Sequence, residues 1–239
     1  MVSKNELELT IILPAYLEEE NLRILLPRIK AVLEEIEPSS EIIVIDTESP
    51  LDKTQEVCLD VGAQYFNRSG SNSYGAAIRT GISQAKGRKV IFMDADGSHA
   101  PEFIRNLYEK KDQADIVIAS RYIKGGYTEN SPVLVFMSLV LNITYSFVLN
   151  LKVKDVSNSF KLYSGPQLKG LSLECDNFDI VEEIIYKLSR LHPNLRIMEI
   201  PFSFKKRMFG DTKRNLLIFI VNYLFTIIRL RMMKVTPKK

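Results

Sequence analysis

The chain has 239 residues, of which 46% are hydrophobic and 26% are charged. This composition is typical of one folded domain with a full core. The net charge of +3 is too small to indicate nucleic acid as a partner. Cys58 and Cys175 lie far apart in the sequence, so neither a zinc site nor a disulfide framework is predicted. The N-terminal residues lack the long apolar core of a signal peptide, and we expect a cytoplasmic location.

Apolar runs and helical patterns alternate along the first half of the chain. Strands are expected at Leu9–Leu13, Glu41–Asp46, Ala63–Phe66, Lys89–Met93 and Ile116–Ala119. Helices are expected at Glu19–Ile36, Asp52–Val61, Tyr74–Ala85 and from Pro101 onward, since proline is tolerated in the first helical turn. This order predicts an α/β fold with a mainly parallel sheet flanked by helices. One domain is favoured because neither repeats nor a low-complexity linker interrupt the pattern.

Residues 90–102 (VIFMDADGSHAPE) carry the clearest chemical signal. The apolar run predicts a buried strand, and Asp94 and Asp96 follow at the edge where open α/β sheets bind ligands. Two carboxylates at this spacing can hold one divalent cation that is shared with substrate phosphates. A solvated acidic turn is the alternative, but the strand before the pair and Pro101-Glu102 after it favour a metal–diphosphate site. His99 is expected close to this site in a structural role.

Several further motifs occur in an order that indicates a family. They are Ile11–Tyr16 with Glu18, Ile43–Asp46, Tyr74–Ala77 with Gly81, Asp94–Asp96, Ser120–Tyr122, Asp155–Lys161 and Arg207–Lys213. The chain resembles inverting family 2 glycosyltransferases with the Rossmann-like A-type fold. Within them it is most similar to the dolichyl-phosphate mannosyltransferase and polyprenyl-phosphate glycosyltransferase branch. The resemblance implies a catalytic domain over residues 1–213 and an amphipathic, basic C-terminal helix and tail over residues 214–239.

The resemblance also implies a role for each matching residue. It implies that the nucleotide is contacted by Pro14, Ala15, Tyr16, Glu18, Asp46, Ala77, Asp94, Ala95, Asp96, Arg207 and Lys213. The donor would be GDP-mannose or a UDP-sugar, with Mg²⁺ or Mn²⁺ held on its diphosphate by Asp94, Asp96 and Ser98. The metal would neutralise charge on the leaving nucleoside diphosphate. Arg121, near phosphate, and Arg207, on a loop that closes over the donor, complete the catalytic set with the two aspartates.

The implied acceptor is a polyprenyl phosphate. A phosphate monoester has its second pKa at about 6, so it is largely dianionic at neutral pH and needs no strong base. A sugar hydroxyl or other soluble acceptor would need a carboxylate base, for which Asp176, Asp179 and Glu183 are candidates. That alternative stays open, as does a catalytically silent nucleotide-sugar-binding subunit. Thr47 replaces a usual aspartate and Val133–Ser138 lacks an arginine usual in this branch.

Two apolar stretches indicate a membrane surface as a partner. Pro132–Leu151 is long enough to span a bilayer, yet Ser138, Asn142, Ser146 and Asn150 recur every fourth residue. This stripe favours an amphipathic helix that lies on the bilayer or packs on the domain. Leu216–Met233 is a second apolar helix with a basic end, which suits anionic headgroups. We therefore expect peripheral attachment at the cytoplasmic face of a membrane, with a homodimer or a membrane-anchoring partner as further expectations. The alternative is that both helices belong to the core or to a dimer interface.

Overall fold

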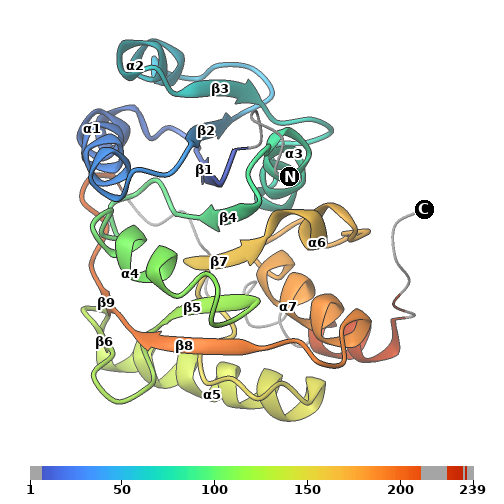
Figure 1. Ribbon diagram of the computed structural model, residues 1–239. Coiled ribbons are helices and arrows are strands. Elements are labelled where there is room, and N and C mark those ends of the chain that lie inside the picture. The colour runs from blue at the N-terminus through green and yellow to red at the C-terminus, as the bar shows by residue number, and fades with distance from the viewer. Residues whose placement is uncertain (1–6, 211–224, 234, 236–239) are drawn as a thin grey trace.

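A seven-stranded sheet forms the centre of the computed structural model, which describes residues 7–210, 225–233 and 235 (Figure 1). The strand order is β3-β2-β1-β4-β7-β5-β8, and β6 and β9 form a separate pair. The strands are β1 (Leu9–Pro14), β2 (Ser40–Asp46), β3 (Gln64–Asn67), β4 (Lys89–Phe92), β5 (Ile116–Ser120), β6 (Tyr127–Thr128), β7 (Lys161–Ser164), β8 (Ile197–Pro201) and β9 (Ser203–Phe204). The helices are α1 (Glu19–Ile36), α2 (Thr54–Val61), α3 (Tyr74–Gln84), α4 (Phe103–Glu109), α5 (Pro132–Leu149), α6 (Gly165–Lys169) and α7 (Ile180–Leu191).

Helices cover both faces of the sheet, which explains why its inner strands carry apolar side chains on both faces. One core contains side chains of α1, α2 and α4 packed on the sheet. The other core contains side chains of α3, α5, α6 and α7 on the opposite face. The sheet is parallel except at β7, which pairs antiparallel with both β4 and β5. The predicted α/β fold with a mainly parallel sheet is therefore confirmed.

Some element boundaries differ from the sequence-based expectation. Pro101 was expected to open a helix, but it lies in a turn, and α4 begins at Phe103. The backbone N–H groups of Phe103 and Ile104 bond to the carbonyl oxygens of Ala100 and Pro101, so this turn leads into the helix. β7 was not predicted, because it is only four residues long and begins with a lysine.

Helix α5 runs along the lower edge of the molecule in Figure 1 and has an unusual orientation. Its polar stripe faces the protein: Asn142 is fully buried, and Ser146 donates a hydrogen bond of 2.5 Å to the carbonyl oxygen of Val153. Its large apolar side chains face outward, and Phe147 is 85% exposed. By length and composition α5 is the one helix in the described part of the chain that could cross a membrane. The expected helix is present, and its inward face carries Asn142 and Ser146 together with the buried Tyr145 and Leu149.

The expected C-terminal helix at Leu216–Met233 is described only in part. Residues 225–232 are helical, and Ile227 and Leu230 belong to the core that includes α5 and α7. Thr226 is also buried and donates a hydrogen bond to the Asp179 carboxylate. Residues 211–224 lie outside the described residues, so the boundary predicted between residues 213 and 214 stays a prediction.

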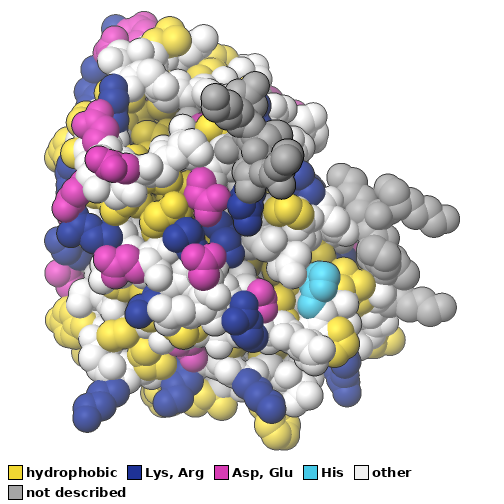
Figure 2. All heavy atoms as spheres, in the orientation of Figure 1, with side chains coloured by type: hydrophobic (Ala, Val, Ile, Leu, Met, Phe, Trp, Pro, Cys, Tyr) yellow, Lys and Arg dark blue, Asp and Glu magenta, His cyan; other side chains and the backbone are white. Residues whose placement is uncertain are grey.

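Acidic and basic side chains are interspersed across the face of the molecule in Figure 2. This mixture agrees with the small net charge of +3. On this face it differs from the broad basic surface that binding to a nucleic acid backbone requires.

Candidate active site

Asp94 and Asp96 follow β4, as predicted, and His99 fixes the first of them. The backbone N–H of Asp94 donates to His99 Nδ1 at 3.0 Å. His99 Nε2 therefore carries the ring proton and donates to Asn158 Oδ1 at 3.1 Å. Burial lowers the pKa of His99, although Asp94 opposes that shift, so the ring is a neutral structural link. This geometry agrees with the structural role expected for His99.

The two carboxylates are held on one side and open on the other. Asp94 Oδ1 accepts hydrogen bonds from Tyr74 and Ser159, at 3.3 and 2.9 Å. Asp96 Oδ1 accepts from the backbone N–H and the hydroxyl of Ser98, at 3.0 and 2.6 Å. Because both aspartates remain about a quarter exposed, at 23% and 24%, their second oxygens can meet a ligand. Ser98 itself is buried and orients Asp96 through these bonds.

This donor set fits a divalent metal whose coordination is completed by the substrate. Within the described residues no group of three or more His, Cys, Asp or Glu side chains forms a complete metal cage. Mg²⁺ is commonly held by one or two carboxylates together with substrate phosphates and water. Asp94 and Asp96 supply that number of carboxylates, whereas Ser98 contributes its hydroxyl to Asp96.

The segment 205–209, which we call the strap, lies across the acidic turn. The backbone N–H of Lys205 donates to the Ser98 carbonyl at 3.1 Å, and that of Met208 donates to the Asp96 carbonyl at 2.9 Å. Met208 also packs so closely over Gly97 that a Cβ there would lie 2.5 Å from its side chain. The strap and the acidic turn are therefore one packed unit.

Arg207 of the strap lies between two carboxylates. Its guanidinium bonds to Glu18, and its Nη1 lies 3.6 Å from Asp96 Oδ2. Glu18 also accepts a hydrogen bond of 2.6 Å from Asn21. Burial raises the pKa of Glu18, and the hydrogen bond from Arg207 works against that shift. Arg207 thus supplies positive charge at the point where the site is most acidic.

The end of β1 leads to an exposed loop. Pro14 ends β1, the buried Ala15 donates its backbone N–H to β2, and Tyr16 and Leu17 are exposed in the loop. Leu17 has a φ of +56°, a left-handed conformation that disfavours a branched side chain and that asparagine tolerates. Glu18 follows directly, so this strained residue sets the position of a predicted nucleotide contact.

Asp46, at the end of β2, is buried and bound by the protein. Its carboxylate accepts a hydrogen bond of 3.0 Å from Tyr65, and burial raises the pKa of Asp46. A buried arginine that the sequence analysis missed, Arg68, lies beside it and donates to the carbonyl oxygens of Asp46, Asn72 and Ser73 at 3.0–3.1 Å. Arg68 therefore joins the end of β2 to the loop before α3. Isolated between polar residues in the sequence, it gave no periodic or motif signal.

Other predicted nucleotide contacts lie inside the fold. Ala77 on α3 and Ala95 between the aspartates are both buried in the two cores, so their side chains serve packing next to the site. Lys213 lies outside the described residues. The structure brings Glu18, Asp94 and Asp96 to the same edge as Arg207.

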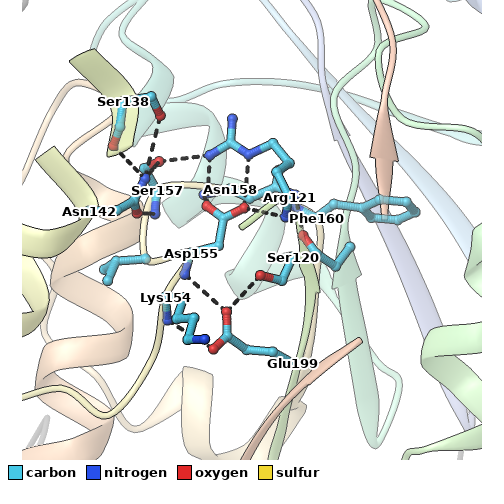
Figure 3. Close-up of polar contacts among 12 residues, drawn as sticks. Ser120, Arg121, Ser138, Asn142, Lys154, Asp155, Ser157, Asn158, Phe160 and Glu199 are labelled. Carbon is cyan, nitrogen blue, oxygen red and sulfur yellow. Dashed lines mark hydrogen bonds and ion pairs between the residues drawn. The ribbon is translucent and has the colours of Figure 1, made fainter. Parts of the chain in front are cut away.

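Arg121 follows β5 and forms a buried ion pair (Figure 3). Its Nε and Nη2 bond to Asp155 at 2.8 and 2.7 Å, and its Nη2 also donates to Ser157 Oγ at 2.9 Å. Burial alone would raise the pKa of Asp155, but the Arg121 charge and hydrogen bonds outweigh it and hold that pKa below its ordinary value. On its far side, the backbone N–H of Asp155 donates to Glu199 at 3.0 Å. Arg121 was predicted to lie near phosphate; the ion pair shows how the protein holds it.

The three carboxylates considered as bases for a hydroxyl acceptor all have structural partners. Asp176 pairs with Arg79 at 2.6 Å, and Asp179 accepts from Thr226 at 2.7 Å. Glu183 pairs with Lys187 at 2.7 Å and accepts backbone hydrogen bonds. Each of the three carboxylates is thus engaged by neighbouring groups of the fold, and this arrangement gives no support to a soluble hydroxyl acceptor.

Residues 10–167 match glycosyl transferase family 2, and the chain belongs to that family. It is 32% identical to a dolichol-phosphate mannosyltransferase of Pyrococcus furiosus over 87% of this chain, and it spans 59% of that protein's length. It is 30% identical to a polyprenol monophosphomannose synthase of Mycolicibacterium smegmatis, covering 86% of this chain and 80% of that protein. An undecaprenyl-phosphate mannosyltransferase of Micrococcus luteus is 29% identical, with coverage of 85% and 86%. The predicted family is therefore confirmed.

Solved structures confirm the fold. Glucosyl-3-phosphoglycerate synthase of Mycobacterium tuberculosis, in complex with phosphoglyceric acid, superposes with a TM-score of 0.73 at 15% identity, covering 95% of this chain and 81% of that one. The same enzyme in complex with Mn²⁺, uridine diphosphate and glucosyl-3-phosphoglycerate gives a TM-score of 0.69 at 16% identity, covering 94% and 80%. The chain thus has the A-type glycosyltransferase fold.

Proposed function

We propose that this protein transfers a sugar, with inversion and with a divalent metal, from a nucleotide-sugar donor to a polyprenyl phosphate at a membrane surface. The observation that carries the proposal is the similarity to three mannosyltransferases whose names specify dolichol, undecaprenyl phosphate or polyprenol, over 85–87% of this chain. GDP-mannose is accordingly the first donor to test, followed by UDP-sugars.

Helix α5 supports the lipid side of the proposal. Its outward face exposes Val133, Phe136, Ile143 and Phe147, an apolar surface of the kind that marks membrane or protein contacts. Its inward face reaches the loop that holds Arg121, since Asn142 bonds to Ser157. A lipid acceptor could thus contact α5 with its chain while its phosphate lies near Arg121.

Side chains of this protein would hold the metal, position the two substrates and supply positive charge next to their phosphates. Mg²⁺ or Mn²⁺, held by Asp94 and Asp96, would act as a Lewis acid on the leaving diphosphate. Arg207 lies 3.6 Å from Asp96, so its guanidinium can pass from the carboxylates to the donor phosphates when these arrive. Arg121, fixed by Asp155, supplies positive charge on the acceptor side. A dianionic phosphate is already nucleophilic, so these residues bring two anions together without a strong base.

A transfer assay tests the proposal. The purified chain is incubated with GDP-mannose or UDP-sugars and Mn²⁺ or Mg²⁺, with polyprenyl phosphate or with the matching polyprenol as acceptor. We expect a glycosylated lipid with the phosphate, none with the alcohol, and loss of product in EDTA. Equal transfer to the polyprenol, or undiminished transfer in EDTA, would show that the acceptor or the metal role is wrong.

A further inference from the structure

Asn142 is a buried polar residue on a mainly apolar helix. It is fully buried, while α5 is apolar enough in composition to cross a membrane. A buried amide is costly unless it is hydrogen bonded, and both ends of this one bind Ser157. Asn142 Oδ1 accepts the backbone N–H of Ser157 at 3.0 Å, and Asn142 Nδ2 donates to Ser157 Oγ at 3.1 Å (Figure 3). Asn142 therefore fixes both the backbone and the hydroxyl of Ser157.

The Ser157 hydroxyl has its acceptor capacity filled. A serine hydroxyl offers two lone pairs and one proton. One lone pair accepts from Asn142 Nδ2 and the other accepts from Arg121 Nη2 at 2.9 Å. The proton must consequently be donated elsewhere, and none of the described residues accepts it. Ser157 is also the one partly exposed residue in 155–160, where its five neighbours are buried.

We propose that Ser157 donates this hydrogen bond to the phosphate of the acceptor and that Asn142 is the residue that positions it. The proposal rests on the function proposed above, because it requires an anionic acceptor. A hydroxyl that accepts from a guanidinium is polarised, which strengthens its own donated bond. Asp155 offsets part of the Arg121 charge, so an outward donor beside the ion pair adds to its attraction for phosphate.

A groove along α5 adjoins the contact between Asn142 and Ser157. It has a volume of about 610 Å³, within the range of small-molecule sites. Leu139, Ile143 and Phe147 line it, and Asn142 belongs both to the groove wall and to the Ser157 contact. The apolar chain of the acceptor would occupy the groove, and its phosphate would extend past Asn142 to Ser157, which lies beyond the groove lining.

Kinetics with a short-chain isoprenyl phosphate in detergent micelles test the role of Ser157. Ser157→Ala should raise the acceptor KM about tenfold or more, as expected for loss of one hydrogen bond to an anion. Ser157→Thr keeps the hydroxyl and should stay close to wild type. The donor dissociation constant, measured by calorimetry without acceptor, should not change. If a thermal melt shows that Ser157→Ala folds poorly, Ser157→Cys takes its place in the kinetics. Cysteine keeps a similar side-chain volume and offers only a weak hydrogen-bond donor.

A double-mutant cycle tests the positioning role of Asn142. Asn142→Ala should raise the acceptor KM in the wild-type background and add little in the Ser157→Ala background, because both act through one hydroxyl. Thr144→Val is the matched control and should leave the KM unchanged, since among the described residues the Thr144 hydroxyl bonds only to Val140 of its own helix.

Three results would overturn the inference. They are an unchanged acceptor KM in Ser157→Ala, additive effects of the two substitutions, or a donor affinity that falls as much as the acceptor affinity. If the wild type still glycosylates the isoprenyl phosphate in such a case, the proposed function stands and only the role of Ser157 fails. If the wild type glycosylates no isoprenyl phosphate, both proposals are wrong.

Discussion

The buried ion pair of Arg121 and Asp155 allows a quantitative prediction. Asp155→Asn keeps the shape of the side chain but leaves the Arg121 guanidinium, 9% exposed, without its counter-charge. Asp155 accepts four hydrogen bonds, three from Arg121 at 2.7–2.8 Å and one from the backbone of Asn158 at 3.2 Å. Removing one partner of a buried pair costs about 3–5 kcal/mol. At about 2–4 °C per kcal/mol for a chain of this size, the melting temperature should fall by about 6–20 °C.

A surface pair of the same geometry provides the control. Arg28 and Glu102 also form a bidentate pair, at 2.8–3.0 Å, but their side chains are 38% and 60% exposed. Glu102→Gln should therefore cost less than about 1 kcal/mol. Urea denaturation followed by circular dichroism compares both variants with the wild type. Equal losses of unfolding free energy in the two variants would refute the argument that burial decides the effect.

The same pair gives a pH dependence with a defined sign. The pKa of Asp155 is lowered in the folded protein, so the folded state favours the ionised carboxylate more than the unfolded chain does. Its contribution to stability is present above the ordinary aspartate pKa of about 3.9 and is lost as the pH falls through the lowered value. The stability difference between the wild type and Asp155→Asn should consequently shrink in that acidic range. A difference that grows with acid would contradict the assignment.

Four further predictions follow from the site and the surface. Asp96→Asn should weaken Mn²⁺-dependent binding of a nucleoside diphosphate at least about tenfold in calorimetry with little change in thermal stability; equal wild-type affinity in EDTA would contradict the metal role. Hydrogen exchange across 204–209 should slow when donor and metal are added, and unchanged exchange at saturation would show that the strap does not order. Phe147→Asp should reduce co-sedimentation with anionic vesicles, whereas Leu59→Asp, at a residue of similar high exposure on α2, should not. Leu17→Asn should raise stability by about 1 kcal/mol by relieving the positive φ, and a lower melting temperature would refute that source of strain.

The sequence predicts β1, β2, β4 and β5 well, because each of these strands contains a run of buried apolar residues. The place of Glu18 was expected only from the family resemblance, whereas the sequence itself predicts that Asp94 and Asp96 lie at the edge where parallel strands end. It fails at β7, a short antiparallel strand whose first residue, Lys161, is fully buried. A buried lysine contradicts the ordinary burial preference, so only tertiary contacts could reveal this strand.

The orientation of α5 shows a second limit. Ser138, Asn142 and Ser146 are four residues apart, which correctly indicates that they share one helix face. Periodicity alone cannot say whether that face meets the protein. Hydrophobic burial would turn that face outward. The structure turns it inward, because the loop after α5 presents backbone groups and a serine that need hydrogen-bond partners. Satisfying buried polar groups therefore outweighs burial of the opposite apolar face, and that face is left for another partner.

One loop connects the acidic pair with Arg121. Residues 155–160 bond to His99, which fixes Asp94, and to Arg121, beside α5. Lys161 holds the same loop from inside by donating to the carbonyl oxygens of Val156, at 2.8 Å, and Asn158, and burial lowers its pKa to about 8. A reaction between two anions depends on how closely opposing charges are placed, more than on proton transfer. This loop therefore sets the distance between the acidic pair and Arg121, through the bonds of Asn158 to His99 and of Asp155 to Arg121.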